Sequence, residues 1–337
     1  MIAKADIVIP CLNEQDHIER CVRSLVNQRQ PKPPIRIWVV DGGSTDGTLT
    51  ILQHLQNEVE ELEVIHNPKK FTPISMNMGI KAGKAPVVII LGAHAEARAD
   101  FVEQNVSTLN NYNEAACVGG LIENIDENRT SEFISKAMGS SFGVGNARFR
   151  TGGQEGWVDT VAFGAYRRSV LDKVGLFDES LIRNQDDELN YRIIRNGYKI
   201  RFNPAIRSRY FVRGSFVKLK KQYQQYGYWK VYVNQKWETV TTLRQLFPAA
   251  FVTFLFSFFL AFFVHTYAFI YGAVLAVYLL LSFAFAIRSC DKFEDVPGVI
   301  RCFFILHFYY GWGYLDGLVR FILLRKPPKK ASKSLSR

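Results

Sequence analysis

The first hundred residues alternate between short apolar runs and stretches in which apolar residues recur every three or four positions. Apolar runs at 6–10, 35–40 and 85–91 predict three strands, and helical spacing follows the first two runs at 18–26 and 49–55. Strand, loop and helix repeated in this order are typical of an open α/β sheet, in which ligands bind beyond the carboxyl ends of the strands. We therefore predict an α/β domain at the start of the chain.

The polar ends of the predicted strands should meet on one rim of the sheet, and they are residues 10–14, 41–46 and 92–96. At the second strand end, Asp41 stands where a carboxylate could meet a base or a ribose edge. Gly42 and Gly43 follow it and let the backbone approach a ligand closely. An ordinary glycine-rich turn with Ser44 or Asp46 as helix cap explains the same residues, and both interpretations stay open.

A second polar cluster precedes a predicted helix near residue 190. Asp186, Asp187 and Glu188 are followed by Leu189 and Ile193 at helical spacing, which places the acids in the first turn. A helix N-terminus favours ionised carboxylates, and an ionised carboxylate at a loop-to-helix junction can act as a general base. The alternative is that the three acids only cap the helix.

The last third of the chain is dominated by apolar and aromatic residues. Two uncharged runs, at about 246–264 and 267–287, are each close to the roughly 20 residues that a membrane-spanning helix needs. A third apolar segment, at about 299–324, carries charges that are expensive in hydrocarbon, and a basic tail follows it. Since such tails stay in the cytoplasm, we predict two spans and an interfacial or third membrane helix. The chain then divides into a domain at 1–235 and a membrane region at 236–337.

The composition of the chain indicates which classes of partner it binds. The net charge of +11 and the pI near 9.4 indicate an anionic partner. No zinc-finger or RNA-binding signature accompanies the charge, so a membrane surface and nucleotide phosphates are favoured and nucleic acid is not. Five cysteines without a Cys-x-x-Cys pair are typical of reduced thiols in the cytosol. No signal-peptide pattern opens the chain, so we expect its soluble part in the cytoplasm. The stretch 139–156, rich in Gly, Ser and Arg, predicts a long mobile loop.

Four separated motifs carry a resemblance to a known family: residues 9–14, 39–48, 77–79 and 186–188. In order and spacing they resemble a family 2 inverting glycosyltransferase with the GT-A fold, over roughly residues 1–230. The resemblance implies a nucleotide-sugar-binding domain with a mixed open sheet, followed by a C-terminal α-helical membrane region. Within that family the chain is most similar to bacterial membrane-attached exopolysaccharide glucosyltransferases of the succinoglycan type. The resemblance implies a nucleotide-diphosphate sugar donor, with UDP as the expected nucleotide and glucose as the expected sugar. It implies a polyprenyl-linked saccharide as the acceptor. It also implies a cytoplasmic catalytic domain on the cytoplasmic membrane and a place in a polysaccharide assembly complex.

The resemblance also implies site residues. Asp186 takes the position of the catalytic base, with Asp187 as the alternative if the register differs by one. The donor would be bound by residues from the strand ends and one helix, namely Pro10, Asn13, Glu14, Asp41, Asn77 and Gly92. The acceptor would be bound by Trp157, Gln225 and Trp229.

The family usually ends the third strand with Asp-x-Asp, and here the triplet is Gly92-Ala93-His94. The leading carboxylate is therefore missing. His94 remains as a ligand for a divalent metal, Mn²⁺ or Mg²⁺, with Mn²⁺ the better match to imidazole. A hydrogen-bonded loop histidine is the alternative interpretation of His94.

Two further functions compete with a single-sugar transferase. A processive polysaccharide synthase would use the Gln-x-x-Arg-Trp element that residues 225–229 resemble, but Tyr228 stands in place of the Arg. A non-catalytic nucleotide-sugar-binding subunit of an assembly complex would explain Gly92, whereas the retained Asp186 argues against it.

Overall fold

The computed structural model describes residues 4–30, 32–212, 214–241 and 243–329. The chain forms two compact units, and each unit is built from two separate segments. We call residues 1–124 and 147–211 the sheet unit, and residues 125–146 and 212–337 the helical unit.

One mixed sheet organises the sheet unit. In the described part of the chain its strands are β1 (Ala5–Cys11), β2 (Ile35–Asp41), β3 (Leu62–His66), β4 (Val87–Ile90), β5 (Ala95–Ala97), β6 (Ala115–Ile125), β7 (Gly156–Val158), β8 (Ala165–Arg167) and β9 (Lys199–Phe211). They lie in the order β3-β2-β1-β4-β8-β6-β9-β5, with β7 beside β9. The first four are parallel, and β8 is antiparallel to both β4 and β6. The predicted mixed open α/β sheet is confirmed.

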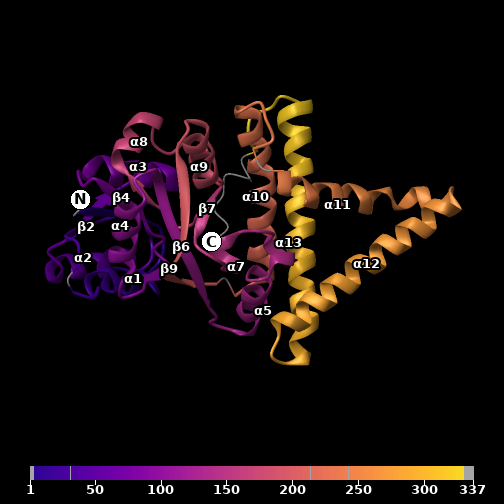
Figure 1. The fold of residues 1–337 in the computed structure, drawn as a ribbon, viewed down its shortest axis with the longest axis horizontal. Coiled ribbons are helices and arrows are strands. Elements are labelled where there is room, and N and C mark those ends of the chain that lie inside the picture. The colour runs from indigo at the N-terminus through magenta and orange to yellow at the C-terminus, as the bar shows by residue number, and fades with distance from the viewer. Residues whose placement is uncertain (1–3, 31, 213, 242, 330–337) are drawn as a thin grey trace. The chain divides into compact units, whose positions relative to one another are not determined.

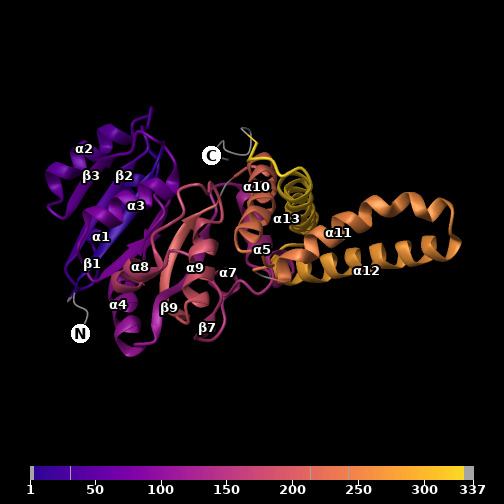
Figure 2. The same cartoon turned by 90° about the horizontal axis from the view of Figure 1, so that it is seen from above.

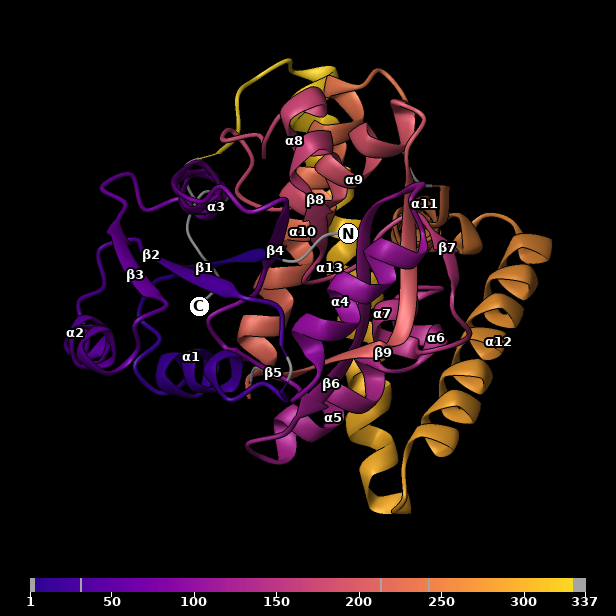
Figure 3. The ribbon, with the colours of Figure 1, turned by 60° about the vertical axis from the view of Figure 1, so that its left-hand side comes forward.

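Helices cover both faces of this sheet. They are α1 (Ile18–Val26), α2 (Thr48–Glu58), α3 (Thr72–Ala82), α4 (Phe101–Asn111), α7 (Arg148–Thr151), α8 (Arg168–Val174) and α9 (Gln185–Arg195). Figure 3 shows β1 and β2 between α3 on one side and α1 and α2 on the other. Successive strand residues point to opposite faces, so Ile7 and Ile9 join the core beneath α1, and Val8 joins the core beneath α3.

Close contact between α3 and the sheet depends on one glycine. A Cβ on Gly79 would lie 2.5 Å from a methyl group of Val8 in β1, so a larger side chain would push the helix away. The family-like motif at residues 77–79 therefore has a packing role in this fold.

The helical unit consists of α5 (Arg129–Met138), α6 (Ser141–Val144), α10 (Phe216–Lys236), α11 (Leu246–Phe256), α12 (His265–Ser289) and α13 (Val296–Gly317). Helices α10 and α13 lie side by side (Figures 1 and 2). Their backbones touch, because a Cβ on Gly227 would lie 2.0 Å from the carbonyl oxygen of Tyr310, and one on Gly313 would lie 2.0 Å from that of Gln224. Small residues at these crossings fix the helix pair.

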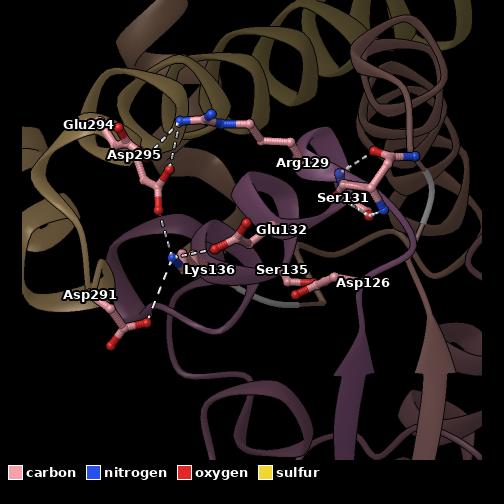
Figure 4. A network of polar contacts seen from close by, with 10 residues as sticks. Asp126, Arg129, Ser131, Glu132, Ser135, Lys136, Asp291, Glu294 and Asp295 are labelled. Carbon is pink, nitrogen blue, oxygen red and sulfur yellow. Dashed lines mark hydrogen bonds and ion pairs between the residues drawn. The ribbon is translucent and has the colours of Figure 1, made fainter.

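Charged side chains join α5 to the start of α13 (Figure 4). The Asp295 carboxylate accepts hydrogen bonds from Arg129 at 3.3 Å and from Lys136 at 3.2 Å. Lys136 also donates to Glu132 at 2.8 Å. Burial acts to lower the pKa of Lys136, but its hydrogen bonds to Glu132 and Asp295 raise it well above the usual value. The network therefore holds a charged lysine between two helices that are far apart in sequence.

Two helical stretches are long and apolar enough to cross a membrane, by length and composition, among the residues that the structure describes. They are Leu243–Phe262 and His265–Ser289, with mean hydropathy 1.9 and 2.3, and 11% of each is buried. In Figure 1 they form a hairpin of α11 and α12. The stretches correspond to the two predicted segments. Residues 330–337 of the predicted basic tail lie outside the described residues.

The division of the chain differs from the boundary at residue 235. Helix α10 and residues 125–146 belong to the helical unit, because α10 packs along α13 and α5 is bonded to Asp295. The stretch 139–156 also differs from the predicted loop, since it contains the short helices α6 and α7. The contacts of α10 with α13 and of α5 with Asp295 join residues far apart in the chain, so no local sequence pattern predicts them.

Candidate active site

The loop after β2 is built around Asp41. Its side chain is 1% exposed, and its carboxylate accepts hydrogen bonds from the backbone N–H groups of Gly43 at 2.8 Å and Ser44 at 3.0 Å, as well as from the Ser44 hydroxyl. Gly43 has a φ of +79°, which glycine adopts without strain. Asp41 therefore holds the shape of the loop from inside.

The ends of β1 and β2 are tied together by Asn13. Its side-chain oxygen accepts a hydrogen bond from Thr45 N–H at 2.8 Å, and its own N–H donates to Ser44 at 2.8 Å. Asn13 has a φ of +52°, a left-handed conformation that asparagine tolerates better than most residues. Pro10 is paired with Val40 just before this junction. The two strand ends therefore form one continuous polar edge.

The end of β4 joins the same edge through His94. Its Nδ1 lies 3.3 Å from Oε1 of Glu14, which follows β1. The imidazole also packs edge-on against Tyr210 of β9, with ring centroids 5.0 Å apart. Three strand ends and β9 thus meet around Glu14 and His94.

The space beside Gly92 is filled by an aromatic ring. A Cβ at this position would lie 3.1 Å from Cε1 of Phe163, and Phe163 itself has a φ of +50°. Phe163 packs against Tyr210 at a centroid distance of 6.4 Å. An aspartate at residue 92 would therefore press on Phe163, whose ring would have to shift slightly to admit it.

The residues at this edge fit a divalent ion only in part. Nowhere in the described ranges do three His, Cys, Asp or Glu side chains gather into a potential metal site. Glu14 and His94 do offer one oxygen and one nitrogen donor 3.3 Å apart. Ions at nucleotide sites are commonly held by one or two protein groups together with substrate phosphates. Glu14 and His94 therefore suit an ion that is held by two protein groups and substrate phosphates, and they do not suit one held by the protein alone.

The acids at the start of α9 differ from one another in exposure. Asp186 is exposed, Asp187 is half-buried and Glu188 is fully buried. Asp186 accepts a hydrogen bond from the N–H of Asp187 at 2.9 Å, in the first helical turn where the partial positive charge favours a carboxylate. Burial raises the pKa of the Tyr166 phenol, and the charges of Cys117 and Asp186 add to this effect. Of the three acids, Asp186 is the one most open to solvent at the start of the helix.

Glu188 and Arg192 anchor α9. Arg192 donates to the Glu188 carboxylate at 2.8 Å and to the carbonyl oxygens of Val174 and Leu176, each at 2.7 Å. Arg192 therefore positions the acidic cluster on the preceding turn. A direct role of this guanidinium at a phosphate is disfavoured by these bonds.

Asn77 has a place that the sequence analysis did not predict. It is 4% exposed, and its amide donates to Phe177 O at 2.8 Å and to Glu179 at 3.1 Å, while accepting from Phe177 N–H at 3.0 Å. The amide is thus occupied by the segment that leads to α9. Asn77 fastens this segment to α3 and does not line a nucleotide site directly.

Trp157 lies far from the edge that carries His94. Trp157 of β7 pairs with Arg201 of β9. Tyr210, nine positions after Arg201 in β9, pairs with Ala95, which is next to His94. At about 3.3 Å per residue, these positions are about 30 Å apart. Trp157 instead packs against Tyr112 and the Arg201 guanidinium. Trp157 therefore does not line the edge that carries His94, and its assignment to an acceptor site stays a prediction.

Gln225 and Trp229 are buried in the helical unit. Trp229 has no exposed surface and packs edge-on against Tyr228 and Tyr232, and Gln225 is 5% exposed. A sugar cannot stack on an indole face that the protein already covers. The predicted stacking of an acceptor on Trp229 is therefore not compatible with this packing.

Two aromatic residues at the edge escaped sequence reasoning. Phe163 and Tyr210 stand 70 or more positions from the strand ends that they contact, and neither belongs to one of the four motifs. No spacing or composition signal distinguishes them from ordinary core aromatics.

Comparisons with known proteins agree with this geometry. Residues 6–175 match the profile of the family described as "Glycosyl transferase family 2". The dolichyl N-acetyl-alpha-D-glucosaminyl phosphate 3-beta-D-2,3-diacetamido-2,3-dideoxy-beta-D-glucuronosyltransferase of Methanococcus voltae is 31% identical over 324 residues, covering 93% of this chain and 97% of that protein. The succinoglycan biosynthesis protein ExoA of Rhizobium meliloti (strain 1021) is 30% identical over 251 residues, covering 72% and 74%.

The fold also has a solved counterpart. The crystal structure of GalNAc-T7 with UDP, GalNAc and Mn²⁺ superposes with a TM-score of 0.51 at 19% identity, over 63% of this chain and 44% of that chain. At this identity the similarity speaks for the GT-A-like fold alone. The profile match and the two relatives go further, and they show that this chain is a member of glycosyltransferase family 2.

Proposed function

We propose that the protein transfers a hexose from a nucleotide-diphosphate sugar to a lipid-linked saccharide, with inversion at the anomeric carbon. The observation that carries this proposal is Asp186, an exposed carboxylate at the N-terminus of α9 in a family 2 chain. A sugar hydroxyl is a weak nucleophile until a positioned base takes its proton. Asp186 would take this proton while the hydroxyl attacks from the face opposite the nucleotide, and Asp187 is the alternative base.

The donor would lie along the polar edge formed by the strand ends. The β2 loop, shaped by Asp41 and Asn13, presents backbone groups and glycines that a nucleotide can approach closely. UDP-glucose is the first donor to test. Asp41 contributes by holding this loop, and Asn77 contributes by holding the segment before α9.

A divalent ion would be held by Glu14 and His94, with the diphosphate completing its ligands. When bound, the ion would neutralise charge on the leaving diphosphate. Mn²⁺ suits an imidazole donor better than Mg²⁺ does. A fold neighbour was solved with Mn²⁺ and UDP, which supports the same choice for testing.

The acceptor and the location follow from the helical unit. The relative from Methanococcus voltae is named for transfer to a dolichyl-phosphate-linked sugar, and the one from Rhizobium meliloti for succinoglycan biosynthesis. The two apolar stretches of this chain would insert into the membrane where such lipids reside. We place the catalytic domain on the cytoplasmic side, because nucleotide sugars are made there, and the enzyme in surface-glycan biosynthesis beside other assembly proteins.

The test is incubation of membranes containing the protein with a panel of labelled nucleotide sugars, followed by extraction of the lipid fraction. We expect label from one donor to enter the lipid fraction, and the Asp186→Asn protein to abolish this transfer. Nucleotide binding without any transfer would instead support the non-catalytic subunit. Long water-soluble polymer as the product would support a processive synthase.

A further inference from the structure

The structure places Arg150 beside the edge that carries His94. Arg150, in the short helix α7, has its guanidinium carbon 5.5 Å from the centroid of the Tyr210 ring. Tyr210 in turn packs against the imidazole of His94 at 5.0 Å. Tyr210 thus contacts both the Arg150 guanidinium and the imidazole of His94, the candidate ligand of a metal ion.

Arg150 differs from neighbouring arginines in its partners. In the described residues its contacts are the rings of Tyr210 and Phe149 and the amide oxygen of Asn124 at 3.5 Å, and none of them is a carboxylate. By contrast, the guanidiniums of Arg20 and Arg209 both lie within 4 Å of Glu96. The Arg150 charge is therefore not neutralised by an acid, and an anion would gain more from it.

Phe163 makes this charge more important. Its ring packs closely against Gly92, and with glycine at this position the edge has one carboxylate fewer with which to hold a metal. The half-buried ring of Phe163 and the buried ring of Tyr210 give this side of the site an apolar wall. Fixed charges act more strongly where water is excluded.

We propose that Arg150 binds the diphosphate of the donor and stabilises it as a leaving group, and this inference rests on the proposed function. As the acceptor oxygen bonds to the anomeric carbon, the bond from that carbon to the phosphate oxygen breaks and its electron pair stays on the diphosphate. The proton of the acceptor hydroxyl goes to Asp186. The planar guanidinium offers paired N–H donors that match phosphate oxygens. Arg150 thereby supplies charge in addition to whatever a metal held at His94 provides.

The test compares binding of UDP and UMP to the full-length protein by calorimetry, with and without a chelator. We expect Arg150→Ala to weaken UDP binding at least tenfold in both conditions and to leave UMP binding within twofold of wild type. The UDP affinity of Arg150→Lys should lie between those of wild type and Arg150→Ala, because lysine keeps the positive charge and loses the paired N–H donors of the guanidinium. Arg148→Ala is the matched control, since Arg148 lies in the same helix and donates to the backbone of Gln154.

The outcomes separate the two proposals. If wild-type protein binds neither UDP nor UMP, the uridine nucleotide donor of the proposed function fails. If wild-type protein prefers UDP to UMP and Arg150→Ala keeps this preference, the Arg150 assignment is wrong. Unchanged UMP binding by Arg150→Ala shows in the same experiment that the variant is folded.

Discussion

Asp41 at the end of β2 and Asp186 at the start of α9 are both acids that follow a family pattern, and they stand in opposite environments. Asp41 is almost fully buried, and its oxygens accept hydrogen bonds from its own loop. Asp186 is exposed, and the bond described for its oxygen comes from the adjacent N–H of Asp187. A buried and bonded acid maintains architecture, whereas an exposed acid on a helix N-terminus can exchange a proton. Burial thus separates two roles that the sequence alone does not separate.

The largest effect should come from the exposed acid. We expect Asp186→Asn to lower turnover by about 10²–10⁴-fold, on the order of what a general base contributes, while nucleotide affinity and thermal stability stay near wild type. Turnover measured with labelled donor, together with calorimetry, checks both parts. Loss of activity in Asp187→Asn with near-normal Asp186→Asn would move the base by one residue.

The buried acid should show the reverse pattern. Asp41→Ala leaves two N–H groups and the Ser44 hydroxyl without their acceptor, which should cost about 3 kcal/mol in the free energy of unfolding and weaken donor binding. Denaturant unfolding measures the first effect and calorimetry with UDP the second. A stable Asp41→Ala protein with unchanged UDP affinity would contradict the comparison.

Gly92 tests whether crowding explains the missing carboxylate. We expect Gly92→Asp to destabilise the protein by about 2 kcal/mol, as overpacking usually does, because its Cβ would press on Phe163. Adding Phe163→Ala should recover most of this loss and tighten Mn²⁺ binding. Unfolding curves and Mn²⁺ titration of the single and double variants measure these effects. A single variant as stable as wild type would show that Phe163 yields freely.

The smallest effect concerns pH and Asp46 in the same β2 loop. Burial acts to raise the pKa of Asp46, but hydrogen bonds from Thr48 and from the Gln15 N–H outweigh it and lower the pKa below its ordinary value. A carboxyl with a lowered folded-state pKa adds stability above its unfolded pKa near 3.9 and loses it as pH falls through the folded value. Asp46→Asn should therefore be less stable than wild type at pH 7, and the difference should shrink below about pH 4. Melting temperatures across this range would reveal a pH-independent difference if the assignment is incorrect.

The sequence predicted what depends on nearby residues. The partners of Asp41 lie within three positions, and apolar periodicity marks the strands and helices around it, so both the loop and the α/β sheet could be expected. The position of Phe163 against Gly92 could not, because it depends on how β8 and β4 pair across some 70 residues. The position of Trp157 in the sheet could not be predicted for the same reason, since only the register of β7 on β9 shows which end of the sheet it occupies. A motif therefore predicts contacts between neighbouring residues, but it does not predict distances between residues that are far apart in the sequence.

The ion pairs between α5 and Asp295 have a consequence for synthesis on the ribosome. Arg129 leaves the ribosome 166 residues before its partner Asp295. At about 5–20 residues per second, this interval lasts roughly 10 to 30 s. During that time the last strand of the sheet unit has already been made, while Phe133, which later packs against Gly298, still lacks its partner. In a chain shortened at residue 235, Arg129 and Phe133 would never gain their partners in the C-terminal helices. We therefore expect residues 1–235 to aggregate when they are expressed alone.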